Sequence, residues 1–114
     1  LELSRGCIFS CRFCAYPYTG KQMYVNDRHC DCIENELRHN YEKWGVTNYI
    51  MLDETFNASL ERNKSFLEVT RRLPFKINYS SYCRLDLIAS RPGSEEVLYE
   101  SGLKGIFCGI ETFN

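Results

Sequence analysis

The sequence predicts an α/β protein built on a parallel sheet. Short apolar segments with strand composition alternate along the 114 residues with segments whose apolar residues recur at helical spacing. This alternating order favours parallel strands joined by crossover helices, because parallel neighbours need long connections. Both a doubly wound sheet and a β/α barrel have this order, so the alternation by itself leaves the two architectures open.

The first half of the chain contains a strand, a long loop, a helix and a second strand. Residues 1–4 are expected to form the end of the first strand, and residues 6–26 the loop. A helix with one apolar face is expected to begin at Asp27, which can act as its N-cap, and to end at Gly45. Residues 48–52 (NYIML) have the composition of a short buried strand.

The second half repeats the helix and strand pattern twice. A helix is expected over residues 59–73, because Pro74 disfavours helical backbone in the residue before it. Strands are expected over 76–82 and 105–110, with a short helix over 94–101 between them. The first and last strands would have unpaired edges, through which two copies of the chain can associate.

Charge and length narrow the classes of protein. The 14 basic and 15 acidic residues balance, which gives no basic field for nucleic acid. No apolar run approaches the ~20 residues of a membrane span, and no signal peptide is evident, so a cytoplasmic protein is expected. A complete eight-unit barrel needs ~250 residues. We therefore expect residues 1–114, which begin without methionine, to be the N-terminal portion of a larger domain.

The most informative motif is a cluster of cysteines in the long loop. Cys7, Cys11 and Cys14 form CxxxCxxC within CIFSCRFC. Thiolates select zinc, copper(I) or iron-sulfur clusters, and a cluster with only three local cysteines keeps one metal position open for another ligand. The chain has seven cysteines, an odd number, so they cannot all be paired in disulfides within it.

The spacing and its setting, LELSRGCIFSCRFCAYP with Phe13 before the third cysteine, resemble the radical S-adenosylmethionine (radical SAM) family. The resemblance implies a [4Fe-4S] cluster on the three thiolates and SAM at the open iron, where one electron yields a 5′-deoxyadenosyl radical. It also implies a partial β/α barrel of about six units, of which this chain would supply about the first four strands. An electron donor such as flavodoxin or ferredoxin is expected.

The resemblance also implies SAM contacts at the carboxyl ends of the strands. These are Asp53 or Glu54 for the SAM amino group, Arg84 for its carboxylate, Glu111 for its ribose or methionine part, and Phe13, Ala15 and Tyr16 for adenine. The longer match looks most like the class whose relatives often carry an upstream cobalamin-binding domain, so cobalamin is a further expected cofactor.

Several of these residues have simpler interpretations. Asp53 can cap a turn or a helix, which Asp often does. Arg84 can pair with Asp86 and merely order the loop, and exposed pairs of this kind contribute little stability. Glu111 can be a solvated charge at a strand end. These alternatives stay open at the level of sequence.

The rival function is a cysteine-ligated zinc or iron-sulfur module without catalysis. It needs a fourth protein ligand, and Cys30 or Cys32 are the candidates. On the expected helix, neighbours two residues apart point in different directions, which disfavours a shared metal ion. Among enzymes, a methyl or methylthio transferase and another radical-modifying enzyme remain open, and the sequence does not identify the substrate.

Overall fold

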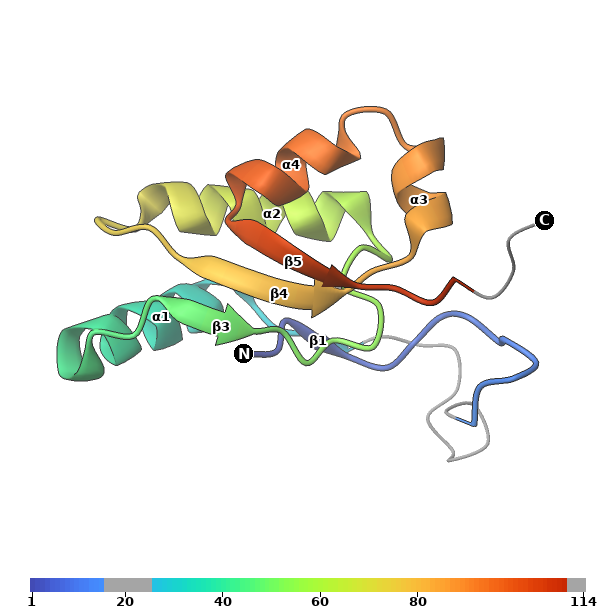
Figure 1. Cartoon of the computed structure of the whole chain (residues 1–114). Helices are drawn as coiled ribbons and strands as arrows, with labels where there is room; N and C mark the ends of the chain where they lie inside the picture. Colours follow the sequence, from blue (N-terminus) through green and yellow to red (C-terminus); the bar gives the residue numbers. More distant parts are fainter. Residues whose placement is uncertain (16–25, 111–114) are drawn as a thin grey trace.

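The computed structural model describes residues 1–15 and 26–110 (Figure 1). Its centre is a sheet of three parallel strands, β3 (Asn48–Ile50), β4 (Asn78–Tyr82) and β5 (Leu103–Phe107), which lie side by side in chain order. The predicted α/β class with parallel strands is confirmed.

The first residue of the chain is hydrogen-bonded to the backbone beside β3, at the edge of this sheet. The Leu1 amino group donates to the Ile50 carbonyl at 3.0 Å, and Leu52 N–H donates to the Leu1 carbonyl at 2.8 Å. The expected first strand therefore lies beside β3. The residues that follow form strand β1 (Ser4–Arg5), which pairs antiparallel with β2 (Asn26–Asp27). This pairing was not predicted from the sequence.

Local signals explain the two longer helices. Helix α1 (Cys30–Trp44) is capped by His29, whose Nδ1 accepts from Asp31 N–H at 3.3 Å, and it ends at Gly45 with φ of 66°. The expected cap, Asp27, lies in β2 instead, so this boundary was wrong. Helix α2 (Leu60–Arg72) is capped by Ser59, whose Oγ accepts from the N–H of Arg62.

The connection between β4 and β5 contains two helices instead of the expected one. Helix α4 (Ser94–Glu100) matches the prediction closely. Helix α3 (Leu85–Ser90) was missed, because six residues are too few to establish a helical period. Strand β5 also begins at Leu103, two residues before the expected start at 105.

The helices and the sheet share one hydrophobic core. Helix α1 packs on α2 and α2 packs on α4 (Figure 1), with Phe56, Phe66 and Tyr79 in mutual aromatic contact between helix and sheet. Because strand side chains alternate, the opposite face of the sheet carries exposed apolar residues, including Ile50, Tyr82 and Phe107. Among the described residues, no helix is long and apolar enough to cross a membrane.

Candidate functional site

A cavity of about 460 Å³ lies at the carboxyl ends of β3, β4 and β5. This volume falls within the ~300–1,000 Å³ of small-molecule sites. Figure 1 shows the cysteine loop at the same end of the sheet as the strand arrowheads. The lining residues come from that loop and from the segments after the three strands: Cys7, Phe9, Cys11, Phe13, Cys14, Glu54, Thr55, Tyr82, Cys83, Arg84, Leu85, Asp86, Phe107 and Gly109.

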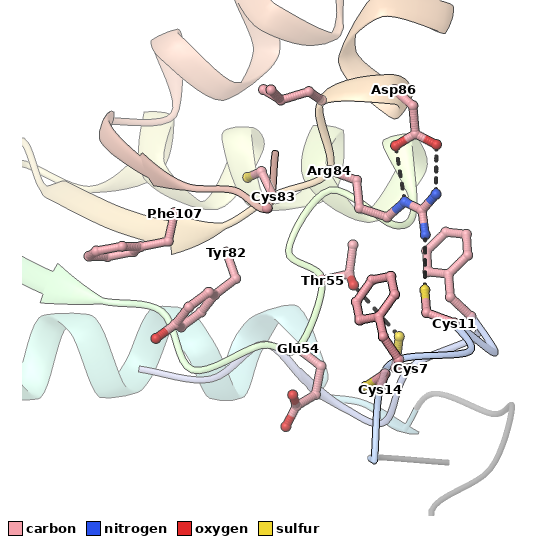
Figure 2. Close-up of a pocket in the computed structure, with 14 residues that line it drawn as sticks. Cys7, Cys11, Cys14, Glu54, Thr55, Tyr82, Cys83, Arg84, Asp86 and Phe107 are labelled. Atoms are coloured by element: carbon pink, nitrogen blue, oxygen red, sulfur yellow. Dashed lines mark hydrogen bonds and ion pairs between the residues drawn. The ribbon is translucent and has the colours of Figure 1, made fainter. Parts of the chain in front are cut away.

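The three clustered cysteines all line this cavity, and each is partly buried. Gly6, at φ of 106°, turns the chain out of β1 into the loop, and Cys14 N–H donates to the Cys11 carbonyl at 3.1 Å. The Cys7 Sγ lies 3.6 Å from the Thr55 hydroxyl (Figure 2). The loop is thus held against the segment that follows β3.

Arg84 joins the cysteine loop to the segment after β4. Its Nη1 donates to Cys11 Sγ at 3.6 Å, and its guanidinium lies 4.2 Å from the centre of the Phe9 ring. On the other side, Nε and Nη2 form a bidentate pair with the Asp86 carboxylate at 3.0 and 2.7 Å (Figure 2). This pairing raises the pKa of Arg84 and lowers the pKa of Asp86, so both groups carry full charge at neutral pH.

The backbone of Arg84 is also fixed. The buried Asn57 amide donates to the Arg84 carbonyl at 2.8 Å and accepts from the Arg84 N–H at 2.9 Å. Two bonds in opposite directions tie the segment after β3 to the segment after β4. Asn57 was not among the predicted site residues, although its place after a strand, in DETFN, is the position where polar contacts were expected.

Asp53 does not face the cavity, contrary to its expected role as a SAM contact. Its carboxylate is 1% exposed and accepts hydrogen bonds from Leu3 N–H, Ser4 N–H and the Ser4 hydroxyl, at 2.8 to 3.0 Å. The Ser4 hydroxyl in turn accepts from Arg62 Nη1 at 2.8 Å. The carboxylate is therefore committed to the first strand, and Asp53 has a structural role that its alternative interpretation only partly anticipated.

The remaining expected contacts divide into three groups. Glu54 and Phe13 line the cavity, with Phe13 75% exposed. Ala15 is exposed and is not among the lining residues. Tyr16 and Glu111 lie outside the described residues. The lining residues that were not predicted from the sequence are Phe9, Thr55, Tyr82, Cys83, Leu85, Phe107 and Gly109.

The cysteines that line the cavity fit an iron-sulfur cluster and a zinc ion to different degrees. Cys30 and Cys32, the candidate fourth ligands of zinc, are not among the lining residues. Cys83 lines the cavity, but burial raises the pKa of its thiol and its Sγ lies 3.3 Å from the Ser81 hydroxyl. Within residues 1–15 and 26–110, no three potential ligands converge as they would on a single ion. A cluster places each thiolate on a different iron atom, so three thiols around one cavity fit a cluster better than a single zinc ion.

Solved structures with the same arrangement of elements identify the fold. The structure of cobalamin-dependent S-adenosylmethionine radical enzyme OxsB with aqua-cobalamin and S-adenosylmethionine bound aligns with a TM-score of 0.73 at 23% identity, over 98% of this chain. The chain has the fold of part of a SAM radical enzyme. OxsB with aqua-cobalamin bound gives the same TM-score, and apo OxsB gives 0.72 at 24% identity.

The likeness covers a limited part of OxsB. This chain spans 18% of the length of the OxsB chains that it matches. No family model matches the sequence, and no curated protein matches it. The comparison with OxsB therefore establishes the fold of this segment.

Proposed function

We propose that this chain is the cofactor-binding portion of a radical SAM enzyme, with a [4Fe-4S] cluster on Cys7, Cys11 and Cys14 and SAM at the open iron. The observation that carries the proposal is the cavity itself, because it gathers the three thiols and the segments after three parallel strands. Functional groups of β/α barrels lie at this end of the strands. The fold shared with OxsB supports the same assignment.

The SAM contacts in this proposal follow the cavity lining. Glu54 is the carboxylate that would accept from the SAM amino group, since Asp53 is committed to the first strand. Three of the five N–H groups of Arg84 have partners among the described residues, so two remain for the SAM carboxylate. Phe13 offers an aromatic face for adenine.

Three expected contacts are carried by the resemblance alone. We retain as predictions a backbone contact from Ala15 and contacts from Tyr16 and Glu111. Tyr16 and Glu111 lie in parts of the chain that the structure does not describe. Cysteine-rich cofactor sites of this kind need a reducing compartment, which supports the proposed cytoplasmic location.

When bound, the cluster would supply the electron that cleaves SAM to methionine and a 5′-deoxyadenosyl radical, and the protein would position the reactants and limit side reactions. Phe9, Phe13 and Phe107 give the cavity part of its aromatic lining. An electron donor such as flavodoxin or ferredoxin would reduce the cluster.

The architecture of the whole protein belongs to the proposal as well. We place these strands as about the first four of a partial β/α barrel, with the exposed apolar sheet face toward its interior. Cobalamin, bound by a domain outside this chain, is the expected second cofactor, as the OxsB likeness suggests. A methyl or methylthio transferase and another radical-modifying enzyme are both compatible with this site.

The proposal is tested on the whole protein as its gene encodes it. After anaerobic reconstitution with iron and sulfide, the reduced protein is mixed with SAM and 5′-deoxyadenosine is measured. We expect four irons per cluster and SAM cleavage. An intact four-iron cluster without SAM cleavage would contradict the proposal.

Two cysteine variants separate the proposal from its rival. Cys7→Ala should lose the cluster, because Cys7 lines the cavity, whereas Cys32→Ala should keep it, because Cys32 is exposed elsewhere on α1. Iron and zinc content and the visible absorption of the cluster are the measurements. Zinc retained by wild type and lost on Cys32→Ala would favour the non-catalytic module.

A further inference from the structure

The guanidinium of Arg84 is held between a carboxylate and a cysteine of the CxxxCxxC motif. Asp86 binds Nε and Nη2 bidentately, which fixes the plane of the group and directs Nη1 to Cys11 Sγ at 3.6 Å. Figure 2 shows this arrangement as a continuous line from Asp86 through Arg84 to Cys11. Bidentate pairing of this type adds orientation as well as energy.

Three further contacts restrict movement of Arg84. Asn57 binds its backbone N–H and carbonyl, and the Phe9 ring lies against the guanidinium at 4.2 Å. Asp86 itself lies in the first turn of α3, the helix for which Arg84 is the N-cap residue. The fold therefore places the positive charge of Arg84 beside Cys11. The Arg84 side chain is only 35% exposed.

We propose that Arg84 is a positioning residue that raises the reduction potential of the cluster through Cys11, with Asp86 as the group that aims it. The inference rests on the proposed function, since it needs the cluster on Cys11. Reduction adds negative charge to a cluster and its thiolates, so a positive donor beside one sulfur stabilises the reduced form more than the oxidised form. The cluster becomes easier for its electron donor to reduce.

Thr55 provides a weaker version of the same effect at a different sulfur. Its hydroxyl lies 3.6 Å from Cys7 Sγ and carries no net charge. Charge-assisted hydrogen bonds are roughly twice as strong as neutral ones. The two contacts also come from different segments, one after β3 and one after β4, so their effects on the potential should add.

The test measures the midpoint potential of the cluster in the reconstituted whole protein, without SAM, by redox titration followed by electron paramagnetic resonance. Omitting SAM keeps any role of Arg84 in binding SAM out of the measurement. We expect Arg84→Gln to shift the potential to a more negative value. Arg84→Lys, which keeps the charge and loses the fork, should shift it less, and Thr55→Val should give a small shift of the same sign.

Arg71→Gln is the matched control. Arg71 is also doubly ion-paired, with Glu68 and Glu100, but it does not line the cofactor cavity, so the potential should equal that of wild type. An unchanged potential in Arg84→Gln with full iron content would overturn this inference and leave the proposed function intact. Loss of the cluster from both Arg84 variants would also overturn it, because the residue would then be needed for assembly. A wild-type protein that forms no four-iron cluster would overturn the proposed function itself.

Discussion

The Asp53 carboxylate binds Ser4 twice: Oδ1 accepts from the Ser4 N–H at 2.9 Å and from the Ser4 hydroxyl at 2.8 Å. The Ser4 hydroxyl accepts in turn from Arg62 of α2. These bonds join β1, which leads into the cysteine loop, to the segment after β3 and to helix α2. The position of the loop therefore depends on a buried polar network of residues that do not line the cavity.

Asp53→Asn should destabilise the protein, because the new amide cannot accept as many hydrogen bonds from the N–H groups that surround it. A buried donor left without a partner costs ~1–3 kcal/mol. Its neighbour provides the control: Glu54→Gln, at an exposed position, should change the free energy of unfolding by less than ~0.5 kcal/mol and should weaken SAM binding. Denaturant titration and equilibrium SAM binding are the measurements. Weakened SAM binding by Asp53→Asn at unchanged stability would contradict the structural role.

Asn57→Ala should loosen the connection between the segments after β3 and β4. The substitution removes both bonds from the buried Asn57 amide to the Arg84 backbone, and the partly buried Arg84 N–H and carbonyl lose these partners. We expect faster amide hydrogen exchange in residues 84–90, measured by mass spectrometry. Asn78→Ala is the control, because its amide makes one exposed contact of 3.4 Å with Asn48. Equal exchange in the two variants would contradict the predicted role of Asn57.

Gly102→Ala and Gly93→Ala separate steric clash from backbone strain. Both glycines have positive φ, 111° and 82°, where an alanine costs ~1–2 kcal/mol. A Cβ at Gly102 would clash with the Ile77 carbonyl oxygen, whereas a Cβ at Gly93 would meet no atom within 4 Å. Gly102→Ala should therefore be less stable by a further ~1–3 kcal/mol in thermal or denaturant unfolding. Equal losses would mean that the backbone at Ile77 can shift freely.

The ion pairs of Glu34, which join α1 to α2, should make a pH-dependent contribution to the free energy of unfolding. Hydrogen bonds from Arg38 and then Arg72 lower the pKa of Glu34 below its ordinary value of 4.5. A carboxyl with a lowered folded-state pKa stabilises the protein above its unfolded pKa, and this contribution is lost as the pH falls through the folded value.

The expected difference between wild type and Glu34→Gln is on the order of 1 kcal/mol at neutral pH. It should begin to shrink as the pH falls below 4.5 and disappear once the carboxyl is protonated in the folded state. Glu61→Gln is the control, since the Glu61 side chain is 84% exposed and has a single 3.4 Å pair with Lys64. Unfolding free energies measured across this pH range provide the check. A constant difference down to the most acidic pH would show that the charge of Glu34 has no part in it.

The features that the sequence predicted by itself are those that depend on residues close together in the chain. The CxxxCxxC loop, the order of helices and strands, and the ends of α2 at Ser59 and Pro74 all depend on residues within a few positions of one another. Helix α3 was not predicted because six residues are too few for a periodic pattern. The cap at His29 was not predicted because the nearby Asp27 is of a residue type that is preferred at helix N-caps.

The tertiary structure alone decided which side chains meet. The sequence offers Asp53 and Glu54 as adjacent carboxylates, and neighbours in extended chain face opposite ways. Their roles were set by Leu3 and Ser4, about 50 residues away, whose N–H groups bind only Asp53. The contacts of Cys7 with Thr55 and Cys11 with Arg84 span 48 and 73 residues. No local pattern encodes such contacts, because parallel strands bring together their carboxyl ends however far apart these lie in the chain.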